Sequence, residues 1–479
     1  MLRAWLYRFA RDRKANVAVI FALTMVPIIF LLGMTLDYTS ALRKKEQLDA
    51  AADAAAIAAV RPAMLQQSDT VASDTAYAIF MSTANSLPGL LAVPTPTITV
   101  TDSGLSRTVS VSYTAQSINN FPKVLDNTAA WSIGGTSTAQ AGSAPNINWY
   151  FLTDDSPSMG IGATYNDISN LITATAPKLQ PDPSSQSCGF ACHEQNPSAD
   201  CSAKSPCSKA VDNLAIATAN NITLRIGLVK NALTQLFVSY QGCPDTSIKT
   251  GVMQCMSALN NTTYKAALYT FDVGLNTLAA LTTPASAGNQ IGNISLMKVD
   301  HQNCVVSTAC TTDYGTDIAG ALTSVNSIMP TPGLGSNAKG DTPQEVVFII
   351  TDGVEDKISG TCPQATKTGF ASNSRCQQPL DTTMCTTLKN RGIKIAILYT
   401  EYLQLKANAS TGITVTDSWY MSWIDPYDEP AADTGQIALN LQACASPGFY
   451  KNVTTGGDIT GALTDLFIKV ASSTASLTQ

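Results

Sequence analysis

The hydrophobic pattern of this chain opens with one long apolar segment. Residues 15–36, ANVAVIFALTMVPIIFLLGMTL, contain no charged side chain. At about 1.5 Å rise per residue, this run is long enough to cross the roughly 30 Å hydrocarbon core of a bilayer as a helix, with a mild kink at Pro27. The segment after it is rich in strong helix formers, so we expect the helix to continue as far as Arg61 and Pro62.

Between this helix and residue 145 the pattern predicts a small α+β unit. Alanine recurs through residues 41–60, and such small side chains let helices pack closely. The segment is therefore either a helix that packs on partner helices or a solvent-exposed stalk, and the pattern leaves both open. A short helix is expected at 73–83. Three segments of alternating β-branched and polar residues then predict strands: TITVTD, RTVSVSYTA and WSIGGTSTAQA.

From residue 146 the pattern becomes that of a different fold. Continuous apolar runs, NWYFLT, YKAALYTF, EVVFIIT and IKIAILYT, alternate with amphipathic helical patterns such as those at 224–240 and 459–472. This alternation favours a mostly parallel sheet covered by helices on both faces. We therefore predict an α/β, doubly wound domain over 146–475, preceded by the small unit at 63–145 and by the transmembrane helix.

Cysteine positions indicate the compartment. All 12 cysteines lie beyond the apolar segment, between Cys188 and Cys444, as is typical of disulfide-bonded proteins in an oxidising environment. Several of them fall in two polar insertions, at about 177–212 and 357–380. Connectivity cannot be deduced from the sequence. Two close pairs are possible: Cys201 with Cys207, and Cys304 with Cys310.

Charge indicates the orientation and excludes one class of partner. A net charge of −6 with 13% charged residues provides no basic surface for nucleic acid. Five basic residues precede the apolar segment and three follow it, which favours a cytoplasmic N-terminus. Residues 1–62 would then comprise a cytoplasmic N-terminus, the membrane helix and a helical stalk, with the remaining chain outside the cytoplasm. A cleavable signal peptide is the alternative, although its apolar region is normally about 7 to 15 residues.

Candidate chemistry lies at the carboxyl ends of the predicted strands, where open parallel sheets bind ligands. After NWYFLT the chain continues with Asp154, Asp155, Ser156, Pro157 and Ser158. If extended geometry persists, the period of two places Asp154, Ser156 and Ser158 on one side and turns Asp155 away. The sequence thus brings one carboxylate and two hydroxyls toward a common point.

Two further segments supply matching side chains. EVVFIIT is followed by Asp352, and in DYGTDIAGAL Thr316 precedes an expected helix start. The five side chains are hard oxygen donors, which suit Mg²⁺, Mn²⁺ or Ca²⁺ better than zinc or copper. The predicted metal ligands are Asp154, Ser156, Ser158, Thr316 and Asp352. Because only two are charged, the ion keeps the capacity to bind an acidic side chain of a partner protein without catalysing a reaction.

The pattern D-x-S-x-S, with the downstream Thr316 and Asp352, resembles the metal-ion-dependent adhesion site (MIDAS) of von Willebrand factor A domains. All five positions match, and the resemblance spans about residues 146–475. It implies a Rossmann-like α/β fold that carries a divalent cation, commonly magnesium, and serves in protein binding and cell adhesion.

The N-terminal segment, ANVAVIFALTMVPIIFLLGMTLDYTSALRKKEQLDAAADAAAIAA, resembles that of TadG-like proteins of the bacterial tight-adherence (Flp-type) pilus. The resemblance implies a pilus-assembly protein of the inner membrane, with most of the chain periplasmic or extracellular and with pilus or envelope proteins as partners. Processed pilin-like relatives have a small residue before the cleavage point and a Glu five residues into the mature helix. Here Ala15 and Ile20 occupy the region, so we expect an uncleaved anchor.

Other chemistry has weaker support. The stretch CGFACH contains Cys188, Cys192 and His193, but c-type haem attachment uses two residues between the cysteines and here there are three. We expect an ordinary disulfide there. The chain has two histidines in all, neither in a hydrolase-like context, and Glu355 and Asp356 are expected in a solvated loop. We therefore predict a non-enzymatic binding protein. A general surface adhesin without a pilus role and an exported haem redox protein are the alternatives.

Overall fold

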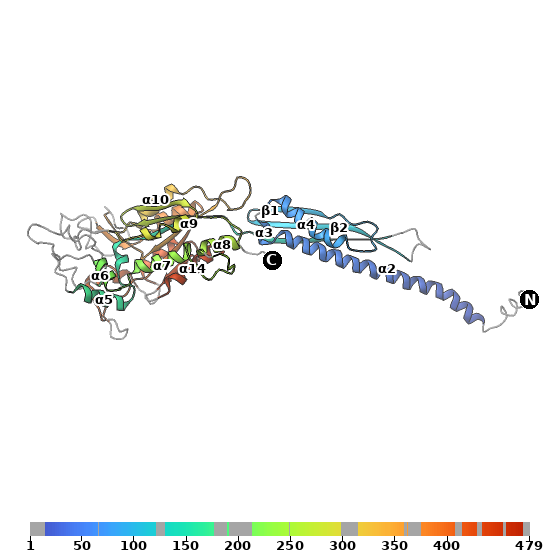
Figure 1. Cartoon of the computed structure of the whole chain (residues 1–479), viewed down its shortest axis with the longest axis horizontal. Helices are drawn as coiled ribbons and strands as arrows, with labels where there is room; N and C mark the ends of the chain where they lie inside the picture. Colours follow the sequence, from blue (N-terminus) through green and yellow to red (C-terminus); the bar gives the residue numbers. More distant parts are fainter. Residues whose placement is uncertain are drawn as a thin grey trace, which may run out of the picture. The chain divides into compact units, whose positions relative to one another are not determined.

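The structure is a computed structural model of the 479-residue chain. It describes residues 15–65, 67–120, 130–176, 189–190, 213–248, 250–297, 315–358, 362, 375–407, 414–428, 434–453 and 457–472. These residues form two compact units, which divide between Ser143 and Ala144. Each unit is described by itself (Figure 1).

The first unit combines a long helix with a small antiparallel sheet. Its elements are α2 (Ala15–Ala59), α3 (Pro62–Leu65), α4 (Asp69–Ala84), β1 (Thr97–Ser103), β2 (Ser106–Ile118) and β3 (Ala130–Gly142). The strand order is β1-β2-β3, and both pairs are antiparallel. The expected helix and the three expected strands are all present. Helix α2 ends at Ala59, just before Arg61 and Pro62.

The two halves of α2 have different surroundings. In the first half, apolar side chains such as Val17 and Leu23 are about 70% exposed (71% and 70%). In the second half, Leu48, Ala52 and other alanines are buried against α4 and the strands. Figure 1 shows the first half extending beyond α4 and the sheet. The alanine-rich segment is thus neither a bare stalk nor reserved for partner helices, because its small side chains pack within this unit.

The second unit is the doubly wound α/β domain that the sequence predicts. Among the described residues, six strands form a sheet in the order β11-β10-β7-β4-β5-β6, in which β6 is antiparallel to β5 and all other pairs are parallel. The strands are β4 (Ile147–Asp154), β5 (Tyr264–Phe271), β6 (Leu275–Thr282), β7 (Gln344–Thr351), β10 (Lys394–Thr400) and β11 (Tyr450–Val453). A separate two-stranded ribbon pairs β8 (Val354–Ile358) with β9 (Arg375–Pro379).

Helices cover both faces of the sheet. The helices and 3₁₀ turns are η2 (Pro157–Gly160), α5 (Tyr165–Thr175), α6 (Asn213–Ala219), α7 (Arg225–Phe237), α8 (Val252–Leu259), α9 (Pro284–Gly288), η4 (Ile291–Asn293), α10 (Ile318–Ile328), α11 (Thr383–Asn390), α12 (Ser418–Trp423), η7 (Asp425–Tyr427), α13 (Gln436–Cys444) and α14 (Ile459–Ser472). Along β7, Val347 and Ile349 join the core formed with α10, α11 and α13. Phe348 and Ile350 join the opposite core with α7, α8 and α14. A strand buried on both faces has no polar face, which explains the continuous apolar runs.

Disulfides occur only in the second unit, as far as the chain is described. They join Cys243 to Cys255, Cys362 to Cys376, and Cys385 to Cys444. The last of these links α11 to α13 across 59 residues of sequence. The two close pairs suggested by the sequence and nearly all of the 177–212 insertion lie outside the described residues.

Candidate metal site at the carboxyl edge of the sheet

Two aspartates end the central strands side by side. Asp154 is the last residue of β4, and Asp352 directly follows β7, the neighbouring parallel strand. Both side chains are completely buried. Burial and the nearby charge of Asp352 raise the pKa of Asp154 well above its usual range. Burial also raises the pKa of Asp352, and the positive charge of Arg225 partly offsets this. Two buried carboxylates in one place favour a bound cation.

The loop after β4 brings its hydroxyls to the same place. The backbone N–H of Ser156 donates to Oδ1 of Asp154 (3.0 Å), and the hydroxyl oxygens of Ser156 and Ser158 lie 3.1 Å apart. Ser156 precedes η2, whose first residue, Pro157, has the fixed φ that suits the start of a helical turn. The hydroxyl of Thr351 donates to Oδ2 of Asp154 (2.6 Å), so this carboxylate is held from two sides.

The turn after β7 requires a glycine. Gly353 has φ +83°, and a Cβ there would collide with Ile437 and Leu441 of α13. Its N–H donates to the Thr351 hydroxyl (3.0 Å), which fixes the rotamer that also reaches Asp154. The sharp turn leaves Asp352 at the edge of the sheet. Within the described part of the chain, Oδ1 of Asp352 has no hydrogen-bond partner, so it is available to a ligand.

Thr316 is held by backbone contacts with β8, beside the loop that follows β4. Its N–H donates to the carbonyl of Asp356 (3.0 Å), and the N–H of Asp356 donates back to the carbonyl of Thr316 (2.8 Å). The preceding Gly315 lies directly against Pro157, whose ring a Cβ would strike. Thr316 is therefore next to the loop that carries the two serines, and four of the five predicted ligands, Asp154, Ser156, Ser158 and Asp352, are linked by direct interactions.

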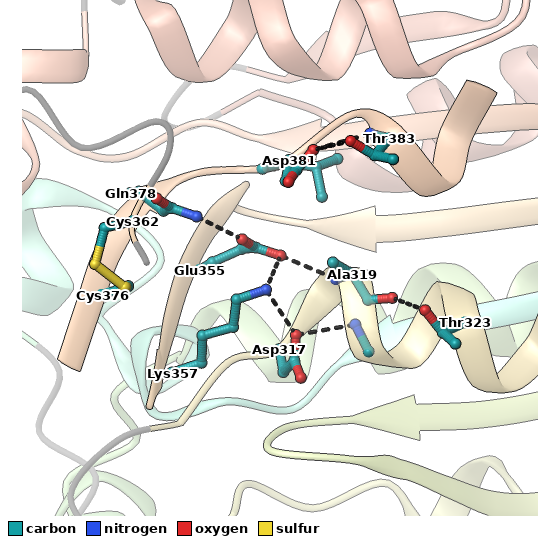
Figure 2. Close-up of polar contacts among 12 residues, drawn as sticks. Asp317, Ala319, Thr323, Glu355, Lys357, Cys362, Cys376, Gln378, Asp381 and Thr383 are labelled. Carbon is teal, nitrogen blue, oxygen red and sulfur yellow. Dashed lines mark hydrogen bonds and ion pairs between the residues drawn. A yellow bond between two sulfur atoms is a disulfide. The ribbon is translucent and has the colours of Figure 1, made fainter. Parts of the chain in front are cut away.

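A partly buried ionic network holds the strand that positions Thr316 (Figure 2). Glu355 of β8 is completely buried and accepts from the N–H of Ala319 (2.9 Å) in the first turn of α10. The ammonium of Lys357 lies 3.0 Å from both Glu355 and Asp317, the residue that caps α10. Gln378 of β9 donates to the other oxygen of Glu355 (3.2 Å). The prediction that Glu355 and Asp356 lie in a solvated loop was therefore wrong, because both belong to β8 and Glu355 is buried.

Asp155 occupies different surroundings from Asp154. Its backbone N–H donates to the carbonyl of Phe271, and its buried carboxylate lies near Thr270 and Asp272, at the end of β5. Burial, with a smaller contribution from Asp272, raises the pKa of Asp155 to about 7. The side chain of Asp154 thus contacts β7, on one side of β4, and that of Asp155 lies near the end of β5, on the other side.

The sequence did not predict that an arginine side chain lies at this site. Arg225, the first residue of α7, is buried, and its Nη1 lies 3.3 Å from Oδ2 of Asp352. Its place at the N-terminus of an apolar helix, where the helix dipole disfavours a positive charge, is a weak signal of an anionic partner and does not identify Asp352. Thr351, the hydroxyl donor to Asp154, was likewise missed because it reads as the last residue of a strand.

The donor set fits a hard divalent cation. No group of three or more His, Cys, Asp or Glu side chains suited to a metal occurs among the described residues. The candidate site instead combines two carboxylates with hydroxyls, and the carboxylate of Asp352 interacts with Ser158 and Tyr402. Such all-oxygen sites suit Mg²⁺, Mn²⁺ or Ca²⁺. The haem candidates Cys188, Cys192 and His193 lie outside the described residues.

These features define a class of protein. The order of the sheet with its one antiparallel edge strand, the helices on both faces and the D-x-S-x-S loop at the carboxyl edge are those of a von Willebrand factor A domain. Before this domain, α2 is long and apolar enough to cross a membrane. Residues 15–62 match the family Tad, described as putative Flp pilus-assembly TadE/G-like. The chain therefore has an N-terminal segment that matches the Tad family, followed by an α/β domain whose strand order and D-x-S-x-S loop are like those of von Willebrand factor A domains.

Solved structures similar to this chain include three of interest. The vWF domain of the type V pili tip protein Mfa5 from Porphyromonas gingivalis has 9% identity and a TM-score of 0.33, over 71% of this chain and 99% of that one. BatB from Bacteroides thetaiotaomicron has 13% identity and a TM-score of 0.28, over 68% and 100%. Proximal thread matrix protein 1 from the mussel byssus, with a zinc-occupied MIDAS motif, has 11% identity and a TM-score of 0.28, over 68% of this chain and 46% of that one.

Identities and TM-scores this low carry no argument about partners or metals. No curated protein gives a significant match to this chain.

Proposed function

We propose that this chain is a membrane-anchored, non-enzymatic component of a tight-adherence pilus-assembly system that binds a partner protein through a divalent cation. The observation that carries the proposal is the pair of completely buried carboxylates, Asp154 and Asp352, at the carboxyl ends of adjacent strands. Burying two like charges is unfavourable unless a cation compensates them. The Tad-type segment supports the pilus context.

In this proposal the ion is bound by the loops and completed by the partner. Asp154 and Asp352 supply the charge, while Ser156, Ser158 and Thr316 supply neutral oxygens. When bound, the ion provides an electrophilic position that an acidic side chain of the partner occupies. This chain's own residues hold the two carboxylates in place, through the Thr351 hydroxyl on Asp154 and the β8 network behind Thr316.

The anchor is the exposed apolar half of α2. A single span within residues 15–36 with a cytoplasmic N-terminus would leave both compact units outside the cytoplasm, in the periplasm or at the cell surface. The three disulfides of the described residues support an oxidising compartment for the second unit.

A pilus-assembly assay tests the proposal. In a strain that lacks this gene, we expect wild-type protein to restore pili and Asp352→Asn to fail, because the amide keeps the shape of the carboxylate but removes half of the site's negative charge. Asp465→Asn, at an exposed position on α14, is the matched control and should restore pili. Immunoblots of membrane fractions establish equal protein levels.

Two results would contradict the proposal. Pili restored to wild-type levels by Asp352→Asn would show that the cation site does not serve assembly. Normal pili in the deletion strain would instead favour a surface adhesin without a pilus role.

A further inference from the structure

The candidate site contains the positively charged side chain of Arg225. Arg225 is 4% exposed, and its Nη1 lies 3.3 Å from Oδ2 of Asp352. Its Nη2 donates to the carbonyl of Glu401 (3.1 Å), and its guanidinium carbon lies 5.2 Å from the centre of the Tyr402 ring. The guanidinium thus has three direct contacts, of which Asp352 is the one with a carboxylate, and the buried carboxyl group of Asp428 also interacts with its charge.

The position of Arg225 is otherwise unfavourable. It is the first residue of α7, where the helix dipole disfavours a positive charge, and burial of a cation carries a desolvation penalty. The backbone fixes it there, because the N–H of Arg225 donates to the carbonyl of Ile161 (3.0 Å), just beyond the loop that carries Ser156 and Ser158. The arginine is therefore built into the same loop assembly as the predicted metal ligands.

The charges explain what this placement does. Asp154 and Asp352 together carry two negative charges when ionised, and Arg225 neutralises one of them. A divalent ion on Asp352 would be a near neighbour of the guanidinium in a water-poor environment, where like charges repel strongly. The Glu401 carbonyl and the Tyr402 ring give the guanidinium two contacts that remain when Asp352 turns to another cation.

We propose that Arg225 is the internal counter-ion of the site, which neutralises Asp352 while no metal is bound and competes with the divalent cation for that carboxylate. This inference rests on the proposed function, because it takes Asp352 as a metal ligand. It predicts a site that stays folded without metal and binds metal more weakly and more reversibly than its two carboxylates alone would.

The test compares variants of the full chain in detergent. Arg225→Met removes the charge and keeps much of the side-chain volume. Lys230→Met is the control on the same helix, since its ammonium contacts the backbone carbonyls of Gly292 and Ile294 and not the site. Mn²⁺ affinity is measured by isothermal titration calorimetry, and melting temperature is measured in EDTA and in saturating Mn²⁺.

Opposite effects on stability and affinity are expected. In EDTA, Arg225→Met should melt several degrees below wild type, because Asp352 is left buried without a counter-ion. Its Mn²⁺ affinity should rise about ten-fold or more, because the competing charge is gone. Lys230→Met should bind Mn²⁺ as wild type does. In saturating Mn²⁺ the melting temperatures of Arg225→Met and wild type should converge.

A double variant keeps the test decisive if Arg225→Met folds poorly. Arg225→Met with Asp352→Asn removes both charges, and in EDTA it should be more stable than Arg225→Met alone. A double variant that is less stable than both single variants would overturn the counter-ion role.

Affinity separates this inference from the proposed function. Mn²⁺ binding that is unchanged or weaker in Arg225→Met would show that Arg225 orients Asp352 for the metal, which overturns the competition while the metal site stands. Absence of Mn²⁺ binding in both wild type and Arg225→Met would overturn the metal site itself.

Discussion

At the scale of single residues, the two consecutive aspartates after β4 differ in their partners. Asp154 accepts from Ser156 and Thr351 beside Asp352, whereas Asp155 turns to the end of β5 near Asp272. Alternation along an extended segment is enough to expect this division from the sequence. What alternation cannot show is that both carboxylates are buried, because burial depends on which strands and loops surround them.

Buried carboxyl groups also determine how stability depends on pH. Glu345, at the start of β7, is 1% exposed and accepts from Asn148 (2.8 Å). Burial raises its pKa to about 7. A folded-state pKa above the unfolded value means that the folded chain holds the proton more tightly. The stabilisation from this group is therefore complete below about pH 4.5 and is lost as the pH rises to about 7.

Glu345→Gln should remove this dependence. The amide oxygen still accepts from Asn148, and the variant should gain about 3 kcal/mol relative to wild type between pH 4.5 and pH 8. Asp155 and Asp428, whose pKa values are also about 7, titrate in both proteins and cancel in the comparison. The measurement is thermal or denaturant unfolding across this pH range in EDTA. A constant difference between the two proteins would refute the assignment, and exposed Asp465→Asn is the control.

At the scale of elements, the ribbon of β8 and β9 supports the site from behind. β8 pairs with Thr316 through backbone hydrogen bonds. It also anchors α10 through the contact of Glu355 with Ala319, which Figure 2 shows. Lys357 neutralises both Glu355 and Asp317 at the N-terminus of that helix. One strand thus fixes the position of the loop that carries the predicted threonine ligand.

Lys357→Met should therefore destabilise the domain. It leaves Glu355 buried without its ammonium partner, and we expect a loss of about 1–3 kcal/mol in the free energy of unfolding. Mn²⁺ affinity should also fall, because the Thr316 loop is less firmly held. Lys406→Met is the matched control, since its ion pair with Asp425 is exposed and contributes little. Equal effects of the two substitutions would show that the network around Glu355 contributes no more than a surface ion pair.

The sequence predicted the elements whose hydrophobic pattern follows directly from their burial, either on both faces of a strand or on one face of a helix. Central strands such as β4 and β7 read as continuous apolar runs, and α7 and α14 as amphipathic patterns, so they were found with nearly correct ends. Strand β6 was missed because an antiparallel edge strand is only partly buried. β8 was missed because its charges read as solvated, and only the fold brings α10 and β9 to Glu355.

Some residues of the candidate site could likewise be predicted from the sequence and others could not. Its five expected ligands follow from the carboxyl ends of parallel strands and from a dispersed motif, and the structure links four of them directly. Arg225 could not be placed from its own surroundings in the sequence. Its partner Asp352 is 127 residues away, and only the packing of α7 on the sheet brings them together.

At the scale of the whole molecule, the chain joins a Tad-type N-terminal segment to an α/β domain with the strand order of von Willebrand factor A domains. The two halves of helix α2 differ. Its apolar half is exposed, and its alanine-rich half packs against α4 and the strands. The sequence predicted the span, but it did not show that this packing makes the second half of the helix part of a compact unit. The proposed function requires that the second unit bind a cation.

Cation-dependent stability tests this central claim most directly. The full chain in detergent is freed of metal with EDTA, and its melting temperature is followed against Mn²⁺ or Mg²⁺ concentration. A ligand that binds only the folded state adds about 2.7 kcal/mol at 100 times its Kd. We predict a rise of several degrees for wild type and for Asp155→Ser, and none for Asp154→Ser. No rise in wild type, or an equal rise in Asp154→Ser, would contradict the account.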